Sequence, residues 1–203
     1  MSHHHQEFTL MPGRQAKLIT SAVLQRVLRH LHQHSGDPVR DRVIILLSVR
    51  AGLRAAEIAQ LSWPMVLDAR GRIGDTVLVT DRIAKKRMGR TIPIHPELRA
   101  ALQGLMSQTG ERDGPVIRSA RGGAMQPNSI VNWFVTLFAV LQIKGCSSHS
   151  GRRTFITQAA RNLHRAGCSL RDVQLLAGHR SIETTQCYIE GHTAGQRKLV
   201  GLL

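Results

Sequence analysis

The chain has 203 residues, enough for one domain or at most two small ones. Its 28 Lys and Arg residues against 13 Asp and Glu give a formal net charge of +15, while 42% of the residues are hydrophobic. This balance excludes a disordered basic tail. No apolar run approaches the ~20 residues of a membrane span, so we do not expect a membrane protein, and we expect neither a secreted disulfide scaffold nor a fibre. It predicts a folded protein whose partner is a polyanion such as nucleic acid.

The kind of positive charge is also informative. Arginine supplies 23 of the 28 cationic residues, and its planar guanidinium binds phosphate in bidentate fashion. A basic protein from an arginine-rich genome remains the alternative on charge alone. The three cysteines, Cys146, Cys168 and Cys187, form no C-x-x-C pair, so we expect reduced thiols, no metal site and a cytoplasmic protein.

The N-terminal third is predicted to be helical after a short arm. Residues 1–14 show no periodic pattern and are expected to form a flexible arm ahead of a single domain over 15–203. Helical spacing of apolar residues predicts an amphipathic helix over about 17–35. A second helix is expected over about 37–52, whose run 43–47 is apolar on all sides and therefore buried, and a short third one covers 55–61.

The pattern changes in the middle of the chain. Three short segments rich in Val, Ile and Thr, at 65–69, 76–80 and 91–94, predict a small antiparallel sheet, with a hairpin tip dense in cations at 81–90. Further helices are expected at 96–107, 128–141, 152–165, 170–176 and 182–188. The predicted fold class is mainly α with a small antiparallel β-sheet (α+β).

Tyr188 is the only tyrosine of the chain, and it stands nine residues after His179. A single tyrosine is usually a packing residue with a hydrogen-bonded hydroxyl. Its surroundings favour another interpretation, because a turn at His179 and a helix over 182–188 would let both side chains face one cleft.

Two upstream clusters and one lysine could join them. Arg54 is followed one turn later by Glu57, which can hold the guanidinium in place and is expected to be structural. His149 and Arg152 are three residues apart at a predicted helix start, a spacing that Arg153 does not keep, and helix starts favour anions. Lys85 lies on the cationic hairpin.

These residue types suit phosphoryl transfer to a protein hydroxyl without a metal. Two fixed guanidiniums can hold the extra negative charge of the transition state. A phenol, with a free pKa of about 10, needs a base to become a nucleophile, and a deoxyribose oxygen needs an acid to leave. No cofactor is therefore expected.

The motifs resemble the tyrosine recombinases, the phage integrase family. The stretches Ala51-Gly52-Leu53-Arg54-x-x-Glu57, His149-x-x-Arg152 and Leu176-Ala177-Gly178-His179 occur in the family's order, with its nine-residue step to the tyrosine. The hairpin resembles the family's lysine hairpin, whose catalytic lysine stands eight residues before a proline, and this register selects Lys85 over Lys86. The match begins at about residue 15.

The resemblance implies a catalytic set and a reaction. Tyr188 would attack a DNA phosphodiester and form a 3′-phosphotyrosyl link, so that a 5′-hydroxyl of another strand reseals it without ATP. In the family, four protomers exchange strands through a Holliday junction. The implied roles are phosphate binding by Arg54, Arg152 and His179, proton transfer by His149 and protonation of the leaving oxygen by Lys85.

The resemblance leaves the source of specificity open. Most family members carry an N-terminal clamp domain, and the early position of Arg54 predicts a chain without one, like the short recombinases that invert fimbrial switches. Affinity would then come from the basic arm and surface, from self-association or from an accessory DNA-binding protein. On the hairpin, Lys86, Arg87 and Arg90 are expected to be solvated or phosphate-contacting cations. The apolar C-terminal tail is expected to pack in cis or to dock on a neighbouring protomer.

Three functions remain in competition. The first is a site-specific recombinase acting on double-stranded DNA, in the cytoplasm at the nucleoid. The second is topoisomerase-like nicking and sealing, for which the same residues suffice. The third is a DNA-binding protein without chemistry, which the six residues Arg54, Lys85, His149, Arg152, His179 and Tyr188 argue against, because a pure binder has no need of them.

Overall fold

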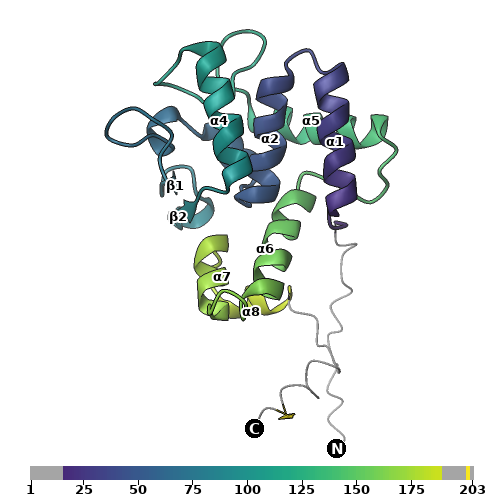
Figure 1. The fold of residues 1–203 in the computed structure, drawn as a ribbon, viewed down its shortest axis with the longest axis vertical. Coiled ribbons are helices and arrows are strands. Elements are labelled where there is room, and N and C mark those ends of the chain that lie inside the picture. The colour runs from purple at the N-terminus through teal and green to yellow at the C-terminus, as the bar shows by residue number, and fades with distance from the viewer. Residues whose placement is uncertain (1–15, 189–199, 202–203) are drawn as a thin grey trace, which may run out of the picture.

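The structure is a computed structural model, and it describes residues 16–188 and 200–201. The predicted arm at 1–14 and most of the apolar C-terminal tail lie outside the described residues. Two groups of helices make up the described chain. A larger group stands at one end of the molecule in Figure 1, and a smaller group with the last three helices stands at the other.

The larger group is built around one buried helix. Helix α2 (Pro38–Arg50) packs between α1 (Ser21–His34) and α4 (Pro96–Thr109), while α5 (Pro127–Val140) crosses behind in the view of Figure 1. The run 43–47 in α2 is completely buried, which explains why this run is apolar on all sides. On α1, by contrast, only the face with Leu24, Val27, Leu28 and Leu31 is buried.

Local capping explains where the first two helices begin. The Thr20 hydroxyl accepts the backbone N–H of Val23 at 3.3 Å, and the Asp37 carboxylate accepts that of Arg40 at 3.1 Å. Pro38 occupies the first position of α2, where its missing N–H costs nothing. The predicted pair of N-terminal helices is therefore confirmed, with α3 (Ala55–Gln60) following it.

The sheet is smaller than predicted. Strands β1 (Thr76–Val79) and β2 (Arg90–Pro93) pair antiparallel, in a register that sets Thr76 opposite Pro93. The third expected strand, at 65–69, is wrong. Within the described chain that segment follows the 3₁₀ turn η1 (Trp63–Met65), whose Trp63 carbonyl accepts the N–H groups of both Val66 and Leu67, so the backbone turns instead of extending.

The smaller group comprises α6 (Ser150–Asn162), α7 (Leu170–Ala177) and α8 (Ile182–Gln186). Helix α6 packs on α2 and reaches down to α7, which contacts α8 and β2 (Figure 1). Helix α6 begins and ends earlier than the sequence predicts, and α8 ends before Tyr188. The mainly α fold with a small antiparallel sheet is confirmed, and within the described residues no helix is both long and apolar enough to cross a membrane.

Candidate active site

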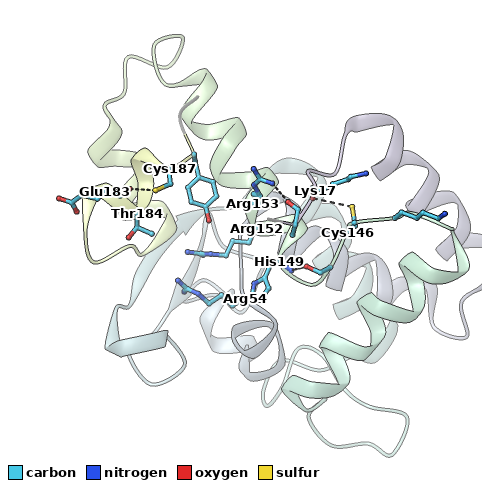
Figure 2. Close-up of a pocket in the computed structure, with 14 residues that line it drawn as sticks. Lys17, Arg54, Cys146, His149, Arg152, Arg153, Glu183, Thr184 and Cys187 are labelled. Atoms are coloured by element: carbon cyan, nitrogen blue, oxygen red, sulfur yellow. Dashed lines mark hydrogen bonds between the residues drawn. The ribbon is translucent and has the colours of Figure 1, made fainter. Parts of the chain in front are cut away.

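A cleft of about 1140 Å³ opens where the two groups of helices meet. Arg54, His149, Arg152 and Tyr188 line it, so four of the six predicted catalytic residues come together. Figure 2 shows Arg54, His149 and Arg152 pointing into the cleft, with Glu183, Thr184 and Cys187 of the α8 region on the opposite wall.

Arg152 joins the two groups of helices. It is buried in the first turn of α6, and its guanidinium donates from Nη1 to the Gly52 carbonyl at 2.7 Å and from Nη2 to the Ala177 carbonyl at 2.5 Å. Gly52 has φ +63°, and a Cβ there would lie 2.4 Å from the Phe155 ring, so only glycine presents its carbonyl in this way. Burial, with the charges of Arg54 and Arg90, lowers the pKa of Arg152 to about 9, which leaves it protonated at neutral pH.

Glu57 orients the second guanidinium of the cleft. Its carboxylate accepts from Arg54 Nη1 and from the Arg54 backbone N–H, both at 2.8 Å, so it holds the side chain and caps α3 at once. Burial alone would raise the pKa of Glu57. The hydrogen bonds and charges of Arg90 and Arg54 outweigh it and lower that pKa to about 2, so the group stays ionised.

The structure places Arg90 differently from the sequence prediction. It was expected to be a solvated or phosphate-contacting cation, but only 8% of it is exposed. Nη1 and Nη2 donate to the two carboxylate oxygens of Glu57, each at 2.9 Å. The reason lies in the alternation of β2, in which position 90 faces inward and Thr91 faces outward.

His179 lies against Tyr188, the predicted nucleophile. Its ring stacks on that of Tyr188 with centroids 5.8 Å apart and planes at 24°, and its Nδ1 is 3.0 Å from the Thr185 hydroxyl. Burial first, and then the charges of Arg152, Arg54 and Arg90, lower the pKa of His179 to about 4, so this imidazole is neutral at pH 7. No sequence signal pointed to Thr185, because six residues from His179 is not a helical repeat.

His149 occupies the opposite side of the cleft. It is exposed at the N-cap of α6, and its backbone N–H donates to the Ser147 hydroxyl at 3.3 Å. The imidazole therefore has access to whatever the cleft holds.

Three further cations line the same cleft: Lys17, Lys144 and Arg153, together called the basic rim below. Arg153 Nη1 donates to the Ala16 carbonyl at 2.5 Å, and the Lys17 N–H donates to the Gly145 carbonyl at 2.8 Å. Sequence analysis missed this rim, because nothing in the sequence brings a residue near the N-terminus beside the loop that precedes α6.

The hairpin residues stand apart. Lys85 and Arg87 are exposed in the 3₁₀ turn η2 (Lys85–Arg87), and Lys85 does not line the cleft. The side chain of Lys86 lies outside the described part of the structure. Among the described residues, no group of three or more His, Cys, Asp or Glu side chains could hold a metal ion.

Known proteins share both the sequence pattern and the fold. The family model described as "Phage integrase family" matches residues 17–194. The tyrosine recombinase XerC of Myxococcus xanthus is 29% identical over 162 residues, which cover 75% of this chain and 50% of the relative, so the chain spans about half of that relative's length.

Solved structures show the same fold at low identity. A Tn1549 transposon integrase in complex with a circular intermediate DNA superposes with a TM-score of 0.75 at 19% identity, covering 95% of this chain and 67% of that one. The XerA recombinase gives a TM-score of 0.69 at 19% identity, over 94% of this chain and 64% of that one. With a family model that matches most of its length and a cleft that gathers the motif residues, the chain belongs to the phage integrase family.

Proposed function

We propose that the protein is a site-specific recombinase that cleaves and rejoins double-stranded DNA through a 3′-phosphotyrosyl intermediate. One observation carries the proposal. The two arginines predicted to be catalytic, a histidine and the only tyrosine of the chain line a single cleft, and a second histidine stacks against the phenol ring. A protein that only bound DNA would have no use for a phenol placed among phosphate-binding groups.

Cleavage would proceed by attack of the Tyr188 hydroxyl on the phosphorus. A bond forms between Oη and phosphorus as the bond to the 5′ oxygen breaks, and His149 takes the phenolic proton. The leaving 5′ oxygen takes a proton from Lys85. Rejoining is the same displacement in reverse by a 5′-hydroxyl of another strand, so the energy of the broken bond is kept and no ATP is consumed.

The cleft would stabilise the transition state by fixed charge. Arg152 keeps N–H groups beyond the two that its described hydrogen bonds to backbone carbonyls use, because a guanidinium has five of them. Glu57 holds Arg54 in place, and the two backbone carbonyls hold Arg152. Neither guanidinium must therefore reorganise when charge builds on the phosphate. In the tautomer whose Nδ1 accepts from the Thr185 hydroxyl, the neutral His179 would have Nε2–H as a donor for a phosphate oxygen.

Lys85 needs the hairpin tip to come over the bound phosphate, since it does not line the cleft. Its role as the acid therefore stays a prediction. Phosphate contact by Lys86 and Arg87, assembly of four protomers on DNA and help from an accessory DNA-binding protein are likewise proposals, and so is action in the cytoplasm at the nucleoid. A DNA partner is supported by the basic rim and by the DNA-bound state of the similar transposon integrase.

The test uses purified protein in EDTA with a supercoiled plasmid that carries the DNA flanking the protein's own gene. After denaturation we expect protein covalently attached to a 3′ end with wild type and none with Tyr188→Phe. Recombinant plasmids with two sites joined would support the recombinase. Adducts and relaxed plasmid without joined sites would favour topoisomerase-like nicking and sealing, and DNA retarded in a gel without adducts would favour a binding protein.

A further inference from the structure

Arg90 contacts three segments of the catalytic centre from a buried position. It opens β2, the strand that returns from the hairpin with Lys85. Its guanidinium fork binds both carboxylate oxygens of Glu57 at 2.9 Å, and its Nε donates to the Leu176 carbonyl at 3.0 Å in the last turn of α7. One side chain thereby connects the hairpin, the Arg54 segment and the segment that leads to His179.

The packing around the fork is tight. Gly178 follows α7 with φ +62°, and a Cβ at this position would lie 2.9 Å from Arg90 Cδ and 3.2 Å from Nη1. The turn that delivers His179 therefore lies directly on the Arg90 side chain. A displacement of that side chain would move this turn as well as Glu57.

Arg90 is not in a position to contact DNA phosphate. It does not line the cleft, and its fork is engaged by Glu57 and the Leu176 carbonyl. Glu57 passes the effect on, because the oxygen that accepts from Arg90 Nη1 also accepts from Arg54 Nη1. The orientation of Arg54 thus depends on where Arg90 holds the carboxylate.

We propose that Arg90 is a positioning residue that aligns Arg54, through Glu57, and the turn before His179 for binding of the scissile phosphate. The inference rests on the proposed function. It requires arginine specifically, because a lysine at this position keeps the charge but has no planar fork to bind two oxygens and a carbonyl together.

The test compares wild type, Arg90→Lys and Arg121→Met in single-turnover formation of the covalent adduct. The substrate is a duplex carrying the cleavage site mapped with wild type. Arg121 is exposed in a turn and does not line the cleft, so its substitution removes one cation without touching the centre. We expect Arg90→Lys to slow adduct formation about 100-fold, as misplacement by about 1 Å can do. We expect its DNA affinity by gel shift to stay within about 3-fold, as residual binding comes from other cations, and Arg121→Met to match wild type.

A second substrate separates positioning from a merely structural role. A duplex with an uncharged methylphosphonate at the cleavage site needs less help from aligned guanidiniums, since less negative charge builds on its oxygens. We expect the defect of Arg90→Lys to shrink at least 10-fold on it, in line with loss of phosphate alignment. An equal defect on both substrates, or no defect at all, would overturn the inference.

A double variant controls for unfolding caused by an unpaired Glu57. Arg90→Met with Glu57→Gln removes the buried carboxylate together with its buried partner Arg90, so neither member of that pair is left as an unpaired charge. A folded double variant that still cleaves slowly supports positioning, whereas recovery of the wild-type rate would show that Arg90 only balances Glu57. Absence of an adduct with wild type would contradict the proposed function itself and the inference with it.

Discussion

The two groups of helices are held together by different forces. The larger group is centred on α2, where five consecutive apolar side chains are completely buried and each contributes roughly 2 kcal/mol. The smaller group, with α6 to α8, has a separate cluster in which four of the described apolar residues are buried: Ile156, Ala160, Val173 and Ala177. Apolar burial therefore fixes the larger group far more firmly than the smaller one.

Directional polar contacts place the smaller group instead. Its buried members include Gln174, His179 and Thr185, and Gln174 Nε2 donates to the His179 carbonyl at 3.0 Å. Arg90 and Arg152 add hydrogen bonds to carbonyls at the end of α7. The comparison teaches that, among the described residues, the group that leads to Tyr188 has less apolar support than the larger group. Under the proposed function this would suit a segment that adjusts around DNA.

The largest effect is expected where the two groups are joined. Arg152→Lys keeps a positive charge but cannot reach the Gly52 and Ala177 carbonyls together and still bind phosphate. Adduct formation should fall about 1000-fold, as it does when preorganised donors are lost, and DNA affinity should change by less than about 3-fold, because the basic rim remains. Single-turnover kinetics and gel shifts measure both, and a loss of affinity alone would contradict this assignment.

Truncation inside the larger group should affect stability instead. Phe134 of α5 is completely buried, so Phe134→Ala should lower the free energy of unfolding by about 3–5 kcal/mol. Val173→Ala, in the smaller cluster, should cost no more than about 2 kcal/mol and raise amide hydrogen exchange in α6 to α8 only. Urea titration with hydrogen exchange tests the pair, and equal, global effects would mean that the two groups unfold as one unit.

Acid should weaken the smaller group first. The folded pKa of His179, about 4, lies below the ordinary 6.5, so the unfolded chain binds this proton more readily. The contribution is complete above pH 6.5 and is lost as the pH falls toward 4, by about 2 kcal/mol once solvent screening is allowed for. Unfolding by urea at pH 7, 5.5 and 4.5 should show most of this loss in wild type and not in His179→Gln.

Glu57 should respond in a lower pH window. Its folded pKa of about 2 lies below the ordinary 4.5, so its stabilising contribution is present above pH 4.5 and disappears only as the pH falls toward 2. If the loss of stability between pH 6.5 and 4.5 is the same in His179→Gln as in wild type, a group other than His179 causes it.

The smallest effect is expected at the basic rim. Lys17 and Lys144 are exposed and line the cleft. Lys17→Gln and Lys144→Gln should each reduce the slope of log K against log salt concentration by about 1, with a modest loss of affinity for any DNA sequence. Gel shifts over a series of salt concentrations measure this slope, with Arg121→Met as the control, and an unchanged slope would remove these lysines from the DNA interface.

Much of the fold could be predicted from the sequence because its signals are local. The periodicity of α1, the apolar run 43–47 of α2 and the Asp37-Pro38 start each depend on neighbours a few residues away. The wrongly predicted strand at 65–69 shows the limit of such local signals. Val and Leu in this segment are compatible with a strand as well as with a turn, and the hydrogen bonds to the Trp63 carbonyl select the turn.

By itself, the sequence predicted a set of chemical groups, from their spacing and from the resemblance to a known family: Arg54, Lys85, His149, Arg152, His179 and Tyr188. Only the tertiary structure decided how they are held. Arg90 became a buried partner of Glu57, Thr185 became the neighbour of His179, and the basic rim formed between distant segments. The physical reason is that spacing along the chain encodes local geometry, whereas the partner of a buried charge is chosen by whichever distant segments packing brings within hydrogen-bond distance.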